Sequence, residues 1–270
     1  MPELPEVETT VRGIRPHIEN QAIKLVEVRN NKLRWPVDIE LPQILATQTL
    51  QSVTRRAKYL LLTFDTGTLI CHLGMSGSLR IITEPTELKK HDHISLYFGN
   101  NIELRYHDPR RFGAMIWTDK PAEQHPLLSH LGPEPDHITD PNYLYQLSRD
   151  KKTAIKTFIM DNHNVVGVGN IYANEALFLS GIHPKRAAGR ISKARFQILQ
   201  RTIQDVLAQA IEQGGTTLRD FVNSDGQPGY FAQQLNVYGK VNQPCPVCET
   251  PIKSLTIAQR NTFYCPNCQR

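Results

Sequence analysis

The chain has 270 residues, of which 40% are hydrophobic and 21% are charged, and its 31 Lys and Arg exceed its 26 Asp and Glu to give a formal charge of +5. This length predicts two domains, and the lack of any apolar run of roughly 18 to 20 residues excludes a membrane-spanning protein. The N-terminus lacks the basic and apolar segments of a secretory signal, so we expect a cytoplasmic protein. The modest positive charge permits a polyanionic partner without identifying one.

The N-terminal half of the chain predicts one helix followed by strands. Apolar residues recur at the helical spacings of 4, 3 and 4, at Val7, Val11, Ile14 and Ile18. We expect Pro16 to end or kink this helix, because proline removes a helical hydrogen bond. From about residue 20 to residue 118, short β-branched and aromatic runs alternate with Gly, Asn and Pro turns. That alternation predicts a β-sandwich or barrel, with Cys71 as a core residue.

The pattern changes to helices after residue 131. Residues 131–141 are rich in Pro and acidic residues and lack periodicity, which is typical of an interdomain linker. Residues 158–178 then predict two helices joined by a Gly-rich turn, with Asn170 capping the second. Such a turn can present backbone N–H groups and a helix N-terminus to a phosphate. The clearest helix is predicted over residues 192–213, where Ser192 caps it and Gly214 and Gly215 end it.

Four of the five cysteines form two CxxC pairs separated by 16 residues, at Cys245, Cys248, Cys265 and Cys268. This is the spacing of a zinc ribbon, in which a β-hairpin between the pairs brings four thiolates to one tetrahedral ion. Two disulfides are the alternative, and they suit a secreted protein. Because the chain shows no secretory signal, we predict one structural Zn²⁺ ion.

Basic residues gather in short groups in both halves of the chain. A single group is typical of a solvated surface, but several groups, with Arg260 at the predicted tip of the ribbon hairpin, favour a two-domain cleft that binds a nucleic-acid backbone. The groups are Arg55-Arg56-Lys58, Lys89-Lys90-His91, Arg105, Arg110-Arg111 and Lys151-Lys152-Lys156.

Six motifs resemble, in order and spacing, those of bacterial formamidopyrimidine-DNA glycosylases. They are PELPEVET at 2–9, RRAKYLLL at 55–62, HLGMSGS at 72–78, DPRRFG at 108–113, VGVGN at 166–170 and the terminal zinc ribbon. The resemblance implies an α+β multidomain fold: a β-sandwich with a leading helix, a helical domain with a helix-two-turn-helix, and a β-hairpin zinc ribbon. We expect a catalytic domain over 1–131, a linker over 132–150, a DNA-binding domain over 151–235 and a zinc finger over 236–270.

The resemblance implies that the start of the chain is catalytic. Removal of Met1, which a small second residue permits, would leave Pro2 with a secondary amine that attacks the sugar C1′ as the damaged base leaves. An α-amino pKa of about 7.7 to 8.0 keeps part of this amine neutral near pH 7. Glu3 is then the acid that donates a proton, Glu6 helps to shape the site, and Lys58 donates a proton in β-elimination.

A base inside a duplex must be extruded before it can be excised, and extrusion leaves a hole in the stack. Met75, Arg110 and Phe112 match the family residues that fill this hole, as a flexible plug, a planar donor and a wedging ring. Taken singly, Met75 and Phe112 are more typical of a core. Residues 219–230 correspond to the loop that covers the extruded base.

The remaining implied contacts are with the DNA backbone. His91, Lys151 and Asn170 match family residues of this kind. Arg260 resembles the residue assigned to proton donation in δ-elimination. Since a guanidinium essentially never loses its proton in proteins, we favour phosphate binding for Arg260.

The predicted function is base excision repair by a bifunctional DNA glycosylase and abasic-site lyase acting on oxidised purines in duplex DNA. One chain contains a complete site, so we expect a monomer. An endonuclease VIII-type glycosylase for oxidised pyrimidines is the first alternative, although its N-terminal motif differs from the Leu4-containing motif here. A non-enzymatic zinc-ribbon DNA-binding protein is the second, but it gives no reason for the adjacent Pro2 and Glu3.

Overall fold

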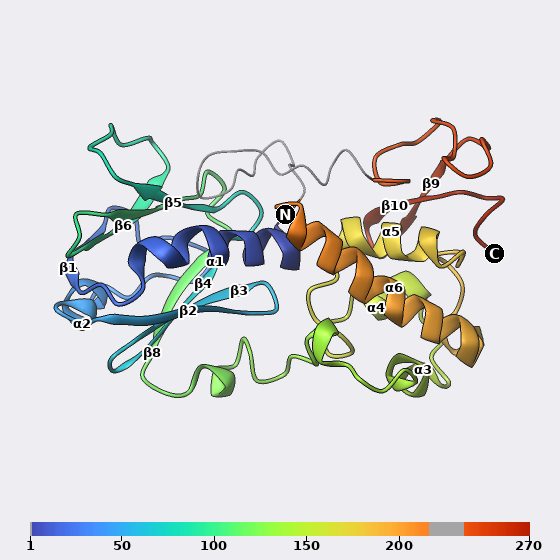
Figure 1. Ribbon diagram of the computed structural model, residues 1–270, viewed down its shortest axis with the longest axis horizontal. Coiled ribbons are helices and arrows are strands. Elements are labelled where there is room, and N and C mark those ends of the chain that lie inside the picture. The colour runs from blue at the N-terminus through green and yellow to red at the C-terminus, as the bar shows by residue number, and fades with distance from the viewer. Residues whose placement is uncertain (1, 216–234) are drawn as a thin grey trace. The chain divides into compact units, whose positions relative to one another are not determined.

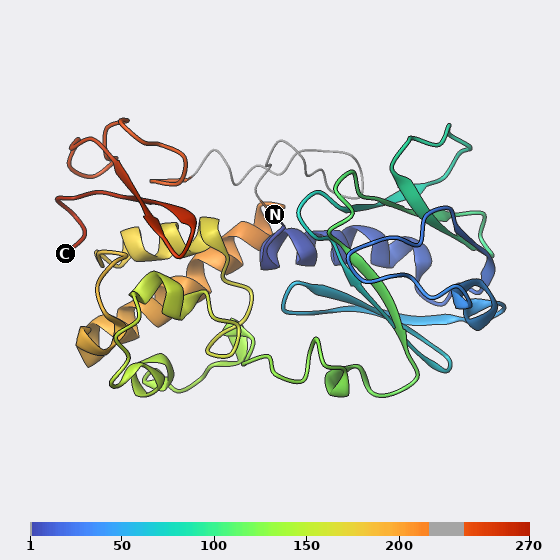
Figure 2. The ribbon, with the colours of Figure 1, turned by 180° about the vertical axis from the view of Figure 1, so that it is seen from behind.

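The computed structural model describes residues 2–215 and 235–270, which belong to two compact units (Figures 1 and 2). The first unit contains residues 2–130 and 213–215, and the second contains residues 131–212 and 235–270. No helix in these ranges is long and apolar enough to cross a membrane. The loop predicted over residues 219–230 lies outside the described residues.

The first unit is a sandwich of two four-stranded antiparallel sheets, which is one of the two architectures predicted from the alternating pattern. One sheet has the strand order β1-β6-β7-β5, and the other has the order β2-β3-β4-β8. The strands are β1 Ile23–Val28, β2 Leu50–Arg56, β3 Tyr59–Phe64, β4 Gly67–His72, β5 Ser78–Ile82, β6 Asp92–Phe98, β7 Glu103–His107 and β8 Ala114–Thr118. Two short helices, α2 Leu41–Leu45 and η1 Ala122–Gln124, complete the unit.

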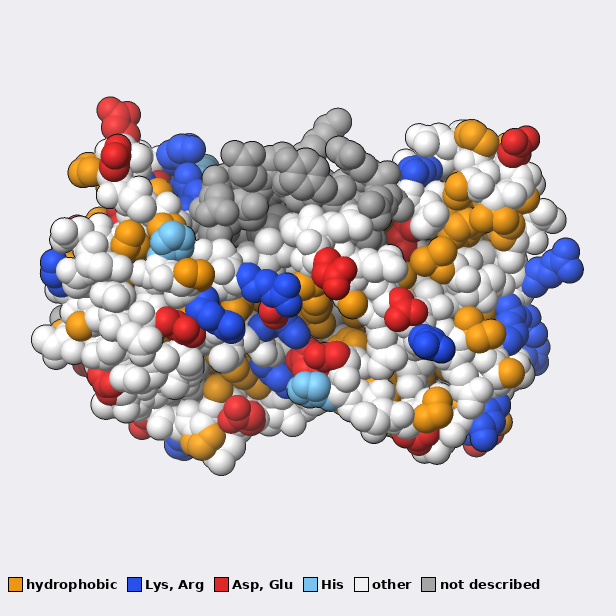
Figure 3. Space-filling view, viewed as in Figure 1, with side chains coloured by type: hydrophobic (Ala, Val, Ile, Leu, Met, Phe, Trp, Pro, Cys, Tyr) orange, Lys and Arg blue, Asp and Glu red, His pale blue; other side chains and the backbone are white. Residues whose placement is uncertain are grey.

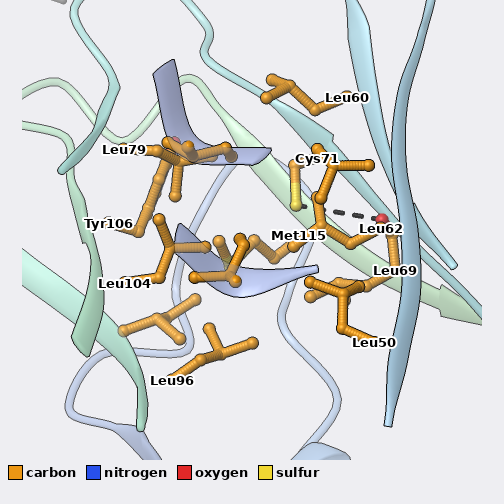
Figure 4. Packing of buried hydrophobic residues seen from close by; sticks show 14 of the residues in the cluster. Leu50, Leu60, Leu62, Leu69, Cys71, Leu79, Leu96, Leu104, Tyr106 and Met115 are labelled. Atoms are coloured by element: carbon orange, nitrogen blue, oxygen red, sulfur yellow. Dashed lines mark hydrogen bonds between the residues drawn. The ribbon is translucent and has the colours of Figure 1, made fainter. Parts of the chain in front are cut away.

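Apolar side chains of both sheets meet in the core of the sandwich (Figure 4). Leu62 and Leu69 of one sheet, and Leu96 and Leu104 of the other, are fully buried. Cys71 lies among them with its Sγ 4.0 Å from the Leu69 carbonyl oxygen, and burial raises the pKa of its thiol. Cys71 is therefore the core residue that the sequence predicted.

Helix α1, Leu4–Ile18, packs on strands of both sheets and so fixes where the chain begins relative to the sandwich. Its Val11, Ile14 and Ile18 are fully buried. Of the two effects expected of Pro16, the end of the helix is wrong, because α1 continues to Ile18, and a kink stays a prediction. Burial of the Ile14 and Ile18 side chains stabilises this last turn despite the hydrogen bond that Pro16 cannot donate.

The second unit is mainly helical and ends in a hairpin. Its elements are η2 Pro135–His137, α3 Tyr143–Ser148, α4 Ile155–Ile159, α5 Asn170–Leu179, η3 Ala188–Arg190, α6 Lys193–Glu212, β9 Lys253–Ile257 and β10 Arg260–Tyr264. The long helix α6 agrees with the prediction: the Ser192 carbonyl accepts the Phe196 N–H at 3.0 Å, and Gly214 follows the helix with a φ of +75°.

The structure adds detail to one local expectation for this unit, the connecting segment, and corrects another, the N-cap of α5. Residues 132–150 contain η2 and α3 and pack on α6, where Gln200 Nε2 donates to the Asp140 carbonyl at 2.8 Å and Gln204 Nε2 donates to the Pro135 carbonyl at 2.7 Å. These partners lie more than 50 residues away, so the composition of the segment does not reveal them. Gly169 rather than Asn170 is the N-cap of α5, and Asn170 is its first helical residue.

Candidate functional site

The start of α1 holds the first predicted catalytic residues in a buried position. Pro2 is buried, and the residues Glu3 and Glu6 are only 2% and 1% exposed. The two glutamates form a capping box, in which the Glu6 carboxylate accepts the Glu3 N–H at 2.8 Å and the Glu3 carboxylate accepts the Glu6 N–H. The capping box therefore fixes the orientation of the Glu3 carboxylate at the start of the helix, one residue after Pro2.

Lys58 lies in the turn between β2 and β3, where Ala57 has a φ of +53°. The Arg55 guanidinium donates to the Ala57 carbonyl at 3.0 Å and forms an ion pair with Glu8 of α1 at 3.0 Å. This pair is largely shielded from solvent, unlike ordinary surface pairs. Arg55 thus ties the Lys58 turn to the helix that follows Glu3. On the face shown in Figure 3, basic and acidic side chains gather over α1 and the neighbouring strands.

His72 ends β4 close to this turn, and its ring centroid lies 4.9 Å from that of Tyr59. Burial, and then the positive charges of Lys58 and Arg34, lower the pKa of His72 to about 4. The imidazole is therefore neutral at pH 7, and its Nδ1 accepts the Gly74 N–H at 3.0 Å. In that tautomer the proton is on Nε2. Sequence reasoning did not single out His72, because its neutral state depends on cations distant in the sequence.

The loops 73–77 and 108–113 are locked together by the fully buried Asp108. Its carboxylate accepts hydrogen bonds from Ser76 Oγ at 3.0 Å, from the Tyr106 hydroxyl at 3.1 Å and from the Gly113 N–H at 2.9 Å. Gly74 has a φ of +63°, and a Cβ there would lie 2.5 Å from the Gly113 nitrogen, so only glycine permits this approach. Asp108 is a residue that sequence reasoning missed, and its place in the DPRRFG motif was the only signal.

Met75, Arg110 and Phe112 lie on these two loops. Met75 is 37% exposed and Phe112 is 43% exposed, and the Arg110 guanidinium stacks 4.8 Å from the centroid of the Phe112 ring. The exposure of two large apolar side chains argues against a core role and favours contact with a ligand. The structure thus brings the three residues onto adjacent, mutually bound loops.

His91 approaches the same loops, because its carbonyl accepts the Asp108 N–H at 3.0 Å. Arg105, by contrast, is not a surface cation. It is 3% exposed, and its guanidinium binds Glu103 at 2.6 Å and Asp92 at 3.3 Å. Grouping Arg105 with the basic surface residues was therefore wrong, because its two acidic partners occupy the same sheet and neutralise it internally.

In the second unit, the start of α5 is bound to the C-terminal hairpin. Asn170 Nδ2 donates to the Asn261 carbonyl at 3.1 Å, while Asn170 Oδ1 is buried and accepts no hydrogen bond from the described residues. Lys156 is 1% exposed, and its Nζ donates to the Asn261 carbonyl at 3.1 Å and to Thr262 Oγ1 at 2.7 Å. Lys156 is therefore a buried cation that holds the hairpin, which corrects its assignment to a surface group; its neighbour Arg260 is exposed.

Lys151, Lys152 and Arg260 are the exposed cations among the residues predicted in this unit. The Lys151 carbonyl accepts the Gly189 N–H at 2.9 Å, so the backbone beneath its side chain is fixed. Arg260 begins β10 directly after a two-residue turn whose residues both have positive φ, and it pairs with Ile257 across the hairpin. A pocket of about 300 Å³ is lined by Lys156, Thr157, Met160, Asp161, Ile257, Ala258 and Arg260.

The four predicted zinc ligands meet at one point, with all their Sγ atoms within 4.8 Å of one another. The separations are 3.9 Å for Cys245–Cys268, 3.5 Å for Cys248–Cys265 and 3.4 Å for Cys248–Cys268. Four thiolates about 2.3 Å from a tetrahedral Zn²⁺ lie about 3.8 Å apart. The geometry fits one zinc ion, and it is far too open for disulfides, whose S–S bonds are about 2.05 Å long.

Glu175 of α5 is a further anchor that sequence reasoning missed. It is 2% exposed, and its carboxylate accepts the backbone N–H groups of Asn236 at 2.7 Å, Val237 at 3.0 Å and Tyr238 at 2.9 Å. These bonds tie α5 to the segment that leads into the zinc ribbon. One acidic residue in a mostly apolar helix was the available signal.

Comparison with known proteins gives matches along the whole chain. Residues 1–115 match the formamidopyrimidine-DNA glycosylase N-terminal domain, residues 131–222 match its H2TH domain, and residues 242–270 match a zinc finger found in FPG and IleRS. The formamidopyrimidine-DNA glycosylase of Methylococcus capsulatus is 59% identical over 100% of both chains. A Lactococcus lactis FPG mutant in complex with Fapy-dG containing DNA superposes with a TM-score of 0.91 at 33% identity, covering 100% of both chains. The FPG protein of Thermus thermophilus gives a TM-score of 0.86 at 36% identity, covering 99% of this chain and 98% of that one.

Proposed function

The chain belongs to the formamidopyrimidine-DNA glycosylase family, and on that premise we propose that it excises 8-oxoguanine and formamidopyrimidines from duplex DNA and then cleaves the strand. The observation that carries the proposal is the buried Pro2 and Glu3 at the start of α1, with the Lys58 turn tied to the same helix. A protein that only binds DNA has no use for this arrangement. One structural Zn²⁺ ion, held by the four cysteines, stabilises the hairpin that carries Arg260.

Excision begins at the nitrogen of Pro2 once Met1 is removed. The secondary amine attacks C1′, a C–N bond forms, and the bond from C1′ to the damaged base breaks with its electron pair leaving on the base. The attached amine then loses its proton, and the C1′–O4′ bond opens with its electron pair on O4′, so that C1′ and the Pro2 nitrogen become an iminium. Glu3 supplies the proton that base departure or this sugar opening requires. The resulting iminium has no N–H to lose, so it stays cationic and accepts electrons during elimination.

Strand cleavage uses this iminium as its electron sink. Loss of a proton from C2′ expels the 3′ phosphate, and a second elimination expels the 5′ phosphate. The Lys58 ammonium serves the proton transfers of the first elimination. Arg260 remains charged and binds a phosphate. His91, Lys151 and Asn170 contact the DNA backbone.

Each domain has a proposed function, and the domains follow one another along the chain. Residues 1–131 form the catalytic domain, residues 132–150 connect it to a DNA-binding domain over 151–235, and residues 236–270 form the zinc finger. One chain supplies every residue of the site, so the enzyme acts as a monomer. Its substrate is the chromosomal DNA of the bacterial nucleoid, which places its work in the cytoplasm.

Borohydride trapping on matched duplexes tests the proposal. A covalent adduct requires a Schiff base, so it separates an enzyme from a protein that only binds DNA. We expect more adduct with a duplex that carries an oxidised purine than with one that carries an oxidised pyrimidine. The reverse preference would indicate an endonuclease VIII-type enzyme, and no adduct with either duplex would refute lyase chemistry.

Arg110 should read the base opposite the lesion. Cytosine offers O2 and N3 as acceptors to a guanidinium, whereas adenine presents an amino donor that arginine cannot satisfy. A bidentate contact is worth roughly 1 to 3 kcal/mol of discrimination, so Arg110→Ala should reduce the preference for cytosine over adenine by about 5- to 150-fold. Single-turnover excision on both duplexes measures this ratio. Phe112→Ala, which removes a ring without hydrogen-bonding groups, should slow both reactions alike; an unchanged ratio in Arg110→Ala would assign the reading to another residue.

Loss of zinc should weaken DNA binding through Arg260. Without the ion, or with Cys248→Ser, the ribbon loses its cross-link and the hairpin no longer presents Arg260 to a phosphate. Four to six phosphate contacts in the intact protein predict a log–log salt slope of about −4 to −5 for the affinity. DNA binding measured over a salt series, with and without a chelator, gives the salt slope of the intact protein and the affinity that remains after zinc removal. Full affinity after chelation, with zinc loss verified by metal analysis, would contradict this role.

A further inference from the structure

A strongly basic pocket of about 550 Å³ lies in the first unit outside the residues assigned above to catalysis. It is lined by Lys32, Leu33, Arg34, Arg110, Arg111 and Phe112. Four of these six residues are cations and none is acidic, so the pocket concentrates positive charge in a concave surface. Such a pocket attracts an anion, because its low-dielectric walls focus the field of the cations.

The cations of this pocket have no acidic partner among the described residues. Within the described ranges, no ion pair is formed by Lys32, Arg34, Arg110 or Arg111, and all four side chains are exposed. Elsewhere in the same unit, Arg55, Arg80 and Arg105 each have a carboxylate partner. Four unpaired like charges around one pocket repel one another, and a bound anion would relieve that repulsion.

Two of the guanidinium groups are already ordered on aromatic rings. Arg34 lies 4.8 Å from the centroid of the Trp35 ring, and Arg110 lies 4.8 Å from that of Phe112. Stacking of this kind holds the plane of the guanidinium while leaving its N–H groups available. Fewer side-chain rotations are then lost when an anion binds.

The backbone on both sides of the pocket is fixed from below. Leu33 and Val37 are buried in the sandwich core, and the Val37 N–H donates to the Asn31 carbonyl at 2.9 Å, which closes the loop that carries Arg34. On the other side, Arg111 has a φ of +56°, a conformation that L side chains rarely adopt. The neighbouring Asp108 carboxylate supports that turn by accepting the Arg110 N–H at 3.3 Å.

The pocket also borders the residues proposed to act on the duplex. Arg110 and Phe112 line it directly, and Arg34 is close enough to His72 to lower the pKa of that imidazole together with Lys58. Because Arg110 is assigned to the base opposite the lesion, an anion beside it in a bound duplex is a phosphodiester of that opposite strand. A duplex bound through Arg110 brings its own phosphate to the pocket. A free anion such as inorganic phosphate has no second contact of this kind to hold it there.

We propose that Arg34 and Lys32 bind one backbone phosphate of the strand opposite the lesion, in the pocket that they share with Arg110 and Arg111. The assignment of the strand rests on the proposed function, whereas the assignment of a phosphate rests on the four unpaired cations. The contact anchors the undamaged strand while the opposite nucleotide is extruded from the stack.

Methylphosphonate substitution tests the contact, because it removes the charge of one phosphate at a time. Each position along the strand opposite an abasic-site analogue would be substituted in turn, and affinities measured for the unmodified protein, Arg34→Ala and Lys32→Ala. Loss of one phosphate contact lowers the salt slope by about 0.9, which at about 0.1 M salt corresponds to an affinity about eightfold lower. We expect a loss of up to this size for each variant on unmodified DNA, and at one position we expect neutralisation to weaken Arg34→Ala and Lys32→Ala less than it weakens the unmodified protein.

Lys120→Ala is the matched control, because Lys120 is an exposed lysine of the same unit at the other end of β8. The five residues of that strand place it about 13 Å or more from the Gly113 end, at roughly 3.3 Å per residue. Neutralising the sensitive phosphate should lower the DNA affinity of Lys120→Ala as much as it lowers that of the unmodified protein. Arg34→Lys should keep most of the salt slope, because the charge remains.

Three outcomes are distinguishable. Coupling between Arg34 and a phosphate of the opposite strand supports the proposal, while additive losses at every position overturn it. Coupling only to a phosphate of the damaged strand overturns the strand assignment. Borohydride trapping of the unmodified protein is scored separately, so a failure of the proposed enzymatic function is not confused with a failure of this contact.

Discussion

Protein in which the Pro2 nitrogen is blocked should form no borohydride adduct with DNA that contains an oxidised purine or an abasic site. The attacking group must be a free secondary amine, and an amide nitrogen has no available electron pair for attack on C1′. Retained Met1 or an N-terminal tag converts the Pro2 nitrogen into such an amide. The adduct is measured by gel after reduction, and we expect it to fall below detection.

The same tagged protein supplies its own control. Proteolytic removal of the tag, so that the chain again begins with Pro2, should restore the adduct without any change in sequence elsewhere. Binding to a duplex with an uncleavable abasic analogue should be largely intact in the tagged form, because the proposed DNA contacts lie at other residues. An undiminished adduct in the blocked protein would eliminate Pro2 as the nucleophile.

Glu3→Gln should reduce excision of an intact damaged base far more than cleavage at a preformed abasic site. Proton transfer from a positioned acid contributes about 10²- to 10⁴-fold in rate, and a carboxamide cannot supply that proton. The abasic substrate has no base to lose, so it bypasses the step in which Glu3 assists base departure. Single-turnover rates on the two substrates give the two losses separately.

The structure makes glutamine a sound replacement. The Glu3 carboxylate accepts the Glu6 N–H in the capping box, and a glutamine carbonyl oxygen can accept the same bond. The thermal unfolding midpoint of Glu3→Gln should therefore stay close to that of the unmodified protein. Glu19→Gln, at the other end of α1, where the carboxylate accepts the Val53 N–H at 2.7 Å, controls for loss of a helix-terminal charge. Equal losses on both substrates would assign Glu3 to the lyase step or to folding.

The zinc ribbon shows what local sequence can determine. Its ligands follow from two CxxC pairs and the length between them, because both the tight turns and the hairpin are local structures. Helix α6 is a similar case, since its apolar period, its Ser192 start and its glycine end all lie within one segment. The alternation of short strands was sufficient for a sandwich or a barrel, and the family resemblance favoured the sandwich, but neither indicated the order of strands in each sheet.

Only the tertiary structure separated the exposed basic residues from the buried ones. The sequence placed Arg105 and Lys156 in the same predicted basic surface as Arg110 and Lys151. In the structure, however, Arg105 and Lys156 are buried against internal partners. Burial of a cation depends on carboxylates and carbonyls that the fold brings from other segments, and no local pattern encodes them.

The candidate site divides along the same line. Pro2, Glu3 and the three residues predicted to fill the void are recognisable from motifs, because their proposed chemistry lies in the residue type. That Met75 and Phe112 are exposed rather than in the core was decided by Asp108, which draws two loops distant in the sequence into contact. The neutral state of His72 and the unpaired charge around Arg34 were likewise decided by three-dimensional proximity, because electrostatic interactions act through space and take no account of sequence order.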